Sequence, residues 1–391
     1  MLFWLFLTSN PSCFSLFVSY AAMFQNCTSF DQNLTRLDTS NVMDMGNMLK
    51  GASSFTNAGA DLILNTENVE TMSGLFESTT FNGNIASWNT TNVRDFSFFA
   101  ANNPLFDGYS ITDWSTLSAT SMAHMFDGCV GLRGDFASFD VSNVQDFSYM
   151  FRGTSTWTSD LASWQTGSAI NMTSMFEGCR FFNRDLNAWD TSNVLSMRAQ
   201  FRDATSFFGL ISNWTVGKVV GFSSMFENAE RFDGDVRNWD VGSAVDFSSM
   251  FKGSSFNRDI SNWNISSQVE DMSQMFSNAI SLTQSLCWDI EESVDTTAMF
   301  QGSGGCLDPS CLDESLWESF ECIDLTPGGV GGDAVDQEDE DGRQPSSGDE
   351  ESNVQANNND SSGSGDYIMV KFDVLLALSL SAMMLVSIAW Q

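Results

Sequence analysis

The side chains that could perform acid–base chemistry are carboxylates, because the 391-residue chain holds 50 Asp and Glu but one histidine, His124. A pair of carboxylates could serve a glycosidase. Most of these acids, however, recur at a fixed spacing, which is typical of residues that cap turns. With one histidine, imidazole catalysis and histidine-rich metal sites are nearly excluded. We therefore predict no enzyme, with no catalytic, cofactor-binding or metal-binding residues.

The net charge also restricts the partners. The chain carries a charge of -34, with 16 Lys and Arg. Phosphate recognition needs clustered cations, so we expect no nucleic acid partner and no adsorption to anionic lipid headgroups. Acidity of this kind fits an extracellular surface. Calcium is the one cation that this pattern would suit, because it would relieve repulsion between acidic side chains stacked about 5 Å apart.

A short internal repeat positions these side chains. A Met-Phe pair or a close variant recurs through the chain, and the steps from Phe126 to Phe276 are all equal in length. One column of tryptophans has nearly the same period, and we predict that it forms a core ladder; a sugar-stacking platform is the alternative. The column contains Trp88, Trp114, Trp164, Trp189, Trp214, Trp239, Trp263 and Trp288.

Local spacing predicts the elements of each repeat. Apolar residues at Val144, Phe147, Met150 and Phe151 lie at i, i+3, i+6 and i+7, which indicates one face of a short helix. The segment 185–189, which ends at a tryptophan, predicts a short strand and turn. We therefore expect an α/β repeat: a leucine-rich-repeat-like solenoid of about 12 coils over residues 17–305, with one short strand and one short helix per coil.

The repeat resembles a known family. The motif Trp-Asp-Thr-Ser-Asn-Val stands at residues 189–194, and Met-Ser-x-Met-Phe stands at residues 272–276. This pattern is similar to the BspA-like leucine-rich-repeat surface proteins, a family that includes mycoplasma lipoproteins and whose repeat has about the same length. The resemblance covers roughly residues 17–305. It implies a surface location and, as in some members, adhesion to host or matrix proteins; it carries no catalytic residues.

The cysteines divide into two groups. Cys27, Cys129 and Cys179 occupy one column, and Cys129 and Cys179 stand two coils apart, which exceeds the Cα separation that a disulfide allows. We predict that these two are free thiols. The disulfide candidates cluster after the repeats, where two bonds would close a cap over residues 306–326, with the pairing left open. They are Cys287, Cys306, Cys311 and Cys322.

The two ends suggest secretion and anchoring. Residues 1–16 are an atypical signal, a cap or the product of a mis-assigned start. Residues 327–366 are predicted to be a disordered acidic linker, and residues 367–391 a membrane-anchoring tail with an apolar C-terminal helix. The tail is either a glycosylphosphatidylinositol signal or a single-pass transmembrane helix. The anchor-attachment candidates are Ser362, Gly363 and Ser364.

Seven Asn-x-Ser/Thr triplets are glycosylation candidates for a secreted chain. They are Asn26, Asn33, Asn89, Asn171, Asn213, Asn264 and Asn359. Together these features predict a cell-surface repeat protein with extracellular repeats, acting as a non-catalytic adhesion or interaction module for an extracellular protein or glycan. The alternative is a structural coat protein of the cell wall or matrix without a specific ligand.

Overall fold

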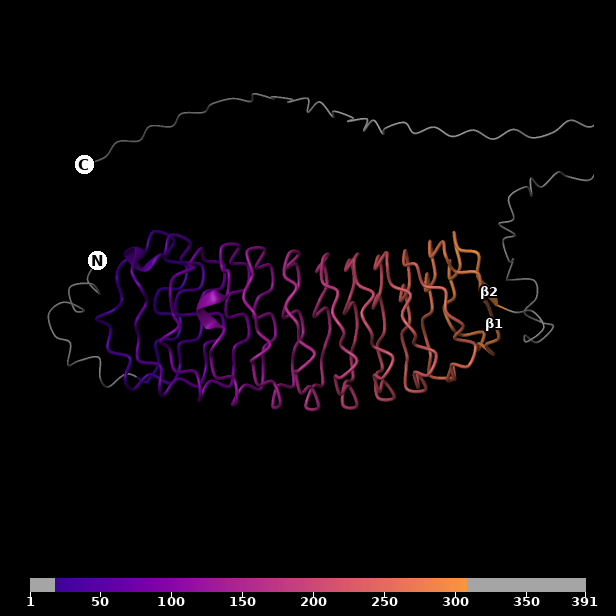
Figure 1. Ribbon diagram of the computed structural model, residues 1–391, viewed down its shortest axis with the longest axis horizontal. Coiled ribbons are helices and arrows are strands. Elements are labelled where there is room, and N and C mark those ends of the chain that lie inside the picture. Colours follow the sequence, from indigo (N-terminus) through magenta and orange to yellow (C-terminus); the bar gives the residue numbers. More distant parts are fainter. Residues whose placement is uncertain (1–17, 308–391) are drawn as a thin grey trace, which may run out of the picture. The chain divides into compact units, whose positions relative to one another are not determined.

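The computed structural model describes residues 18–307, which form a row of stacked coils (Figure 1). Eleven isolated parallel bridges join one residue of each coil to the next, at or close to the interval that the Met-Phe spacing predicts. The bridged residues are Ser19, Asp44, Thr71, Asp95, Ser121, Asp146, Asn171, Ser196, Gly221, Asp246, Asp271 and Asp295.

Regular secondary structure is nearly absent from these coils. In the described part there is no α-helix; the elements are two short 3-10 helices, η2 (Asn57–Gly59) and η3 (Tyr109–Ile111), and two short strands, β1 (Ser285–Leu286) and β2 (Cys306–Leu307). The strands pair in parallel. The prediction of an α/β, leucine-rich-repeat-like solenoid with a strand and a helix in each coil is therefore wrong. The coils are built from turns.

Backbone hydrogen bonds explain why the expected helix does not form. Tyr149 has a left-handed backbone with φ 59°, which interrupts helical geometry. The Phe147 N–H donates to the Asn171 carbonyl (2.9 Å) and the Tyr149 N–H to the Thr173 carbonyl (2.8 Å), both in the next coil. The Met150 N–H donates to the Phe147 carbonyl in its own turn (3.1 Å). Successive turns thus give the same apolar spacing as a helix face.

The expected strand at residues 185–189 is also a turn. The Trp189 N–H donates to the Leu186 carbonyl (3.0 Å), which bends the chain at the point where an extended strand was predicted. The bend directs the Trp189 indole into the core. Its Nε1 donates to the Leu161 carbonyl of the preceding coil (2.9 Å). A side-chain hydrogen bond therefore links these coils here.

Aromatic columns form the core. Trp189 is 3% exposed and stacks between Trp164 and Trp214, with ring centroids 6.1 and 6.2 Å away. A parallel column of phenylalanines continues beside it, for example Phe201 over Phe226 at 5.7 Å. The prediction that the tryptophans form a core ladder is confirmed, and the sugar-platform alternative is wrong.

Several predicted segments lie outside the described residues: 1–16, the part of the 306–326 cap after Leu307, the linker 327–366 and the tail 367–391. The predicted C-terminal apolar helix and transmembrane helix fall on residues 367–391 and so lie outside the described residues. Within residues 18–307, no helix is long and apolar enough to cross a membrane.

Candidate functional site

A backbone ladder displays one side chain from each coil beside the bridges. The Leu195 N–H donates to the Ile170 carbonyl (2.8 Å), and the Val220 N–H to the Leu195 carbonyl (2.9 Å); the same bond recurs between most neighbouring coils. Because the ladder holds each backbone in place, the side chains form a regular row, and all but the half-buried Val245 are exposed. This exposed row consists of Val18, Met43, Glu70, Arg94, Thr120, Gln145, Ile170, Leu195, Val220, Val245 and Glu270.

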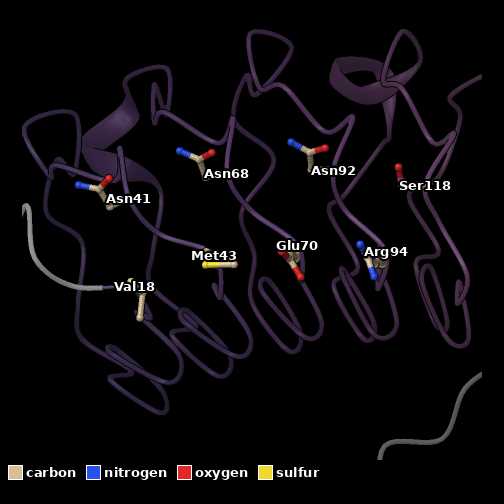
Figure 2. Close-up of a pocket in the computed structure, with 8 residues that line it drawn as sticks. All are labelled: Val18, Asn41, Met43, Asn68, Glu70, Asn92, Arg94 and Ser118. Carbon is tan, nitrogen blue, oxygen red and sulfur yellow. The ribbon is translucent and has the colours of Figure 1, made fainter.

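A groove of about 760 Å³ lies along the first coils of this row. Figure 2 shows two lines of side chains in it, one of amides and a serine, the other taken from the exposed row. The first line is Asn41, Asn68, Asn92 and Ser118, and the second is Val18, Met43, Glu70 and Arg94.

Hydrogen bonds orient the amides of this groove. The Asn68 Nδ2 donates to the Ser40 carbonyl (2.8 Å), and the Asn92 Nδ2 donates to the Glu67 carbonyl (2.8 Å). Among the described residues the Oδ1 atoms of Asn68 and Asn92 accept no hydrogen bond, so they remain available as acceptors. The groove therefore presents repeated acceptors at the spacing of the coils.

Two opposite charges lie beside these acceptors. The Arg94 N–H donates to the Glu70 carbonyl (2.8 Å), so the two residues are neighbours in the ladder, and both side chains are exposed. Within residues 18–307 neither side chain forms an ion pair. The guanidinium and the carboxylate are therefore free to pair with charges of a ligand, and both line the groove with the amides.

A second polar cluster surrounds the single histidine. Asp127 is 4% exposed and binds His124 Nδ1 (2.8 Å) and the Nε and Nη2 of Arg152 (2.8 and 2.7 Å). Burial alone would raise the pKa of Asp127, but the hydrogen bonds and charges of His124 and Arg152 outweigh it and hold the pKa below its usual value. The imidazole is also stacked between Phe98 and Tyr149, with centroids 4.3 and 4.4 Å away.

The contacts of this cluster are those of packing and ion pairing. In the described part, no hydroxyl or thiol hydrogen-bonds to the His124 ring, so the ring is not paired with a nucleophile there. Residues 18–307 also contain no group of three His, Cys, Asp or Glu that could hold a metal ion. The acids stacked at the bridges bind backbone amides instead: Asp146 Oδ1 accepts from the Ser148 N–H (2.9 Å).

The sequence did not single out the partners of His124 or the polar line of the groove. Phe98, His124 and Tyr149 follow one another at about one repeat length, so the period could have shown that they are neighbours. Asp127 and Arg152 are likewise one repeat apart. What the period does not show is that the aromatic column reaches the surface or that the carboxylate of Asp127 is buried while its partner Arg152 is partly exposed.

The described residues include both disulfide-bonded and free cysteines. Cys287 and Cys306 are disulfide-bonded. Cys27, Cys129 and Cys179 are free, and the last two are buried. Burial raises the pKa of Cys179 to about 12. The other disulfide candidates, Cys311 and Cys322, lie outside the described residues.

The glycosylation candidates are placed unevenly. Five are exposed: Asn26, Asn33, Asn89, Asn213 and Asn264. Asn171 is partly buried in the bridge column, where its Oδ1 accepts from the Thr173 N–H (3.1 Å). Asn359 and the anchor candidates Ser362, Gly363 and Ser364 lie outside the described residues. The structure does not bring any of the described candidates into the groove.

Comparison with known proteins corrects the family. No curated protein and no solved structure matches the chain. The family described as "Mycoplasma protein of unknown function, DUF285" matches it in three tandem stretches, residues 15–107, 97–214 and 196–308. No leucine-rich-repeat or BspA-like family matches, so the resemblance to BspA-like proteins is wrong. The three matches span the whole described row of coils, and the chain belongs to the DUF285 family.

Proposed function

We propose that residues 18–307 form a non-catalytic recognition module that binds an extended protein or glycan segment along the groove of Figure 2. The observation that carries this proposal is the contrast between columns. The tryptophan column holds a large buried apolar residue, which is tryptophan in eight coils and Leu37, Leu64 or Phe139 in three others. The exposed row instead changes from apolar to charged to polar between Met43, Glu70, Arg94 and Thr120. A scaffold that holds its core constant and varies one displayed row suits recognition of a specific partner.

The chemistry of the groove supports binding. Free amide oxygens on Asn68 and Asn92 accept hydrogen bonds from hydroxyl or amide groups, and Arg94 and Glu70 add charges of both signs. Because these side chains come from successive coils, a ligand that lies along the row meets one or two of them at each step. A linear segment fits this arrangement better than a compact small molecule does.

We also propose that the module is displayed outside the cell. Disulfides form and persist in oxidising compartments, and Cys287 and Cys306 are disulfide-bonded. The five exposed Asn-x-Ser/Thr asparagines are compatible with secretion. Protease treatment of intact cells checks the location: an external module is degraded while an internal marker protein survives.

The binding test uses the purified full-length chain on an array of extracellular matrix proteins and glycans. We expect saturable binding to at least one component, weakened about tenfold or more by the double substitution Glu70→Gln and Arg94→Gln, since two charge-assisted contacts are lost. Glu270→Gln is the matched control, because Glu270 is exposed in the same row but lies outside the groove.

Two results would contradict the groove proposal. If Glu270→Gln weakens binding as much as the double variant, overall charge and not the groove decides binding. If the chain shows only bulk, salt-sensitive association with every component, a structural coat describes it better than a recognition module does.

A further inference from the structure

One coil exposes large apolar side chains where its neighbours are polar. Phe208 is 49% exposed and Leu210 is 58% exposed. The residues that stand one repeat before and after them are Asn183, Asp185, Asp233 and Asp235. Polar side chains therefore fit these two positions in adjacent coils, and packing does not require an apolar residue here. An exposed apolar pair in such a place indicates a contact surface.

The backbone of this coil leans toward the coil before it. A Cβ atom added at Gly209 would lie 2.0 Å from the Arg184 carbonyl oxygen, so only glycine allows this approach. The Leu186 N–H donates to the Leu210 carbonyl (3.1 Å), again in the direction of the preceding coil. On the opposite side, a pocket of about 340 Å³ lies between residues 208–212 and 231–235.

Charged groups surround the apolar wall of this pocket. The Arg231 guanidinium lies over the Phe208 ring, 4.7 Å from its centroid, and in the described residues it forms no ion pair. Asp233 is paired with Arg258 (2.9 Å), and Asp235 is paired with Arg237 (2.8 Å). The pocket thus offers an unpaired cation, an apolar wall, and two carboxylates that can still accept hydrogen bonds.

We propose that this pocket binds an acidic sugar, that is, a sugar ring that carries a carboxylate. The carboxylate pairs with Arg231, the C–H face of the ring packs on Phe208 and Leu210, and the hydroxyl groups donate to Asp233 and Asp235. A neutral sugar leaves Arg231 without an ion-pair partner. A simple apolar carboxylate has no hydroxyl groups for the two acids. A single sugar ring also suits the volume, which is near the lower end for ligand pockets.

The site is distinct from the groove of Figure 2, so its test stands apart from the proposed function. Calorimetry and saturation-transfer NMR would be run on the full-length chain with N-acetylneuraminic acid and glucuronic acid as probes. N-acetylglucosamine serves as the neutral comparison and benzoate as the carboxylate without hydroxyl groups. We expect saturable binding of at least one acidic sugar, and weaker binding of both comparison compounds.

Substitutions locate the binding. Arg231→Gln is expected to weaken it about tenfold or more, because a charge-assisted pair is lost. Arg180→Gln is the matched control, since Arg180 is an exposed arginine that does not line the pocket. Leu210→Asp restores the residue type of the neighbouring coils, so it is expected to keep the fold and to weaken binding through charge repulsion.

The proposal is overturned by any of three results: neither acidic sugar binds saturably, N-acetylglucosamine or benzoate binds as tightly as the acidic sugars, or both Arg231→Gln and Leu210→Asp bind like the parent chain. Circular dichroism melting of each variant shows whether the fold is kept. If Arg231→Gln unfolds, Leu210→Asp decides the question.

Discussion

Within residues 18–307 the tryptophan column contains one member whose indole N–H has no hydrogen-bond partner, and this predicts a difference between two otherwise similar substitutions. Trp189 Nε1 donates to the Leu161 carbonyl of the preceding coil (2.9 Å). Trp239 is equally buried, at 4% exposed against 3%, but its Nε1 has no hydrogen-bond partner among the described residues. In the coil before Trp239, the residue that corresponds to Leu161 is Ile211. Ile211 belongs to the coil of Gly209, which leans toward the coil before it. We infer that this displacement withdraws the acceptor.

The substitutions Trp189→Phe and Trp239→Phe remove the same indole volume from the same stack, so the cost of the lost packing nearly cancels between them. The first also removes a hydrogen bond, whereas the second removes a buried donor that was already unsatisfied. An unsatisfied buried donor costs about 1–3 kcal/mol. We therefore expect Trp189→Phe to lower the free energy of unfolding by about 1–3 kcal/mol more than Trp239→Phe does.

Urea unfolding of the full-length chain, followed by circular dichroism, measures this difference. Hydrogen–deuterium exchange then localises it, because each coil contacts only its neighbours and a local loss appears as faster exchange in the flanking coils. If Trp239→Phe proves as costly as Trp189→Phe, or more so, the indole of Trp239 has an acceptor and the explanation from the displaced coil fails.

Three further predictions follow from the contacts described above. Gly209→Ala should destabilise the chain in thermal melts, because its Cβ would lie 2.0 Å from the Arg184 carbonyl oxygen; Gly242→Ala, where the nearest atom is a flexible Asp240 side-chain oxygen at 3.3 Å, should cost less. Folding lowers the pKa of Asp127, so its ion pairs stabilise the fold above the ordinary pKa of about 3.9 and lose that effect as the pH falls through the lower folded value. Asp127→Asn should therefore cost about 1–2 kcal/mol near pH 7, and urea titrations should show that the difference shrinks below about pH 4. Native alkylation with iodoacetamide, read by mass spectrometry, should label exposed Cys27 but spare Cys179, whose pKa burial raises to about 12; labelling of Cys179 before unfolding would contradict its burial.

The repeat period could be predicted from the sequence because it depends only on the order of residue types along the chain. The Met-Phe pairs and the tryptophans recur at the same interval as the bridges, and burial of the tryptophans follows from their size and apolar character. Large aromatic side chains that recur once per coil have to be removed from water, whatever path the backbone takes between them. The period and the core column could therefore be predicted without the fold.

The path of the backbone depended on contacts between coils. Residues such as Phe147 and Met150 fit a helical spacing. A backbone N–H group can bond within its own segment or to the next coil, and the spacing of the apolar residues is the same in both cases. Here alternate N–H groups bond to the next coil, and a left-handed residue at Tyr149 makes that possible. The sequence therefore favoured a helix where the structure has turns.

The period and the core column follow from the sequence alone, because both depend on the identity and spacing of residues. The fold was needed to show which columns reach the surface, that Glu70 and Arg94 share a groove with free amide oxygens, and that the coil at Gly209 is displaced. These features depend on how each coil aligns with its neighbours. That alignment is set by backbone hydrogen bonds whose partners lie about one repeat away along the chain.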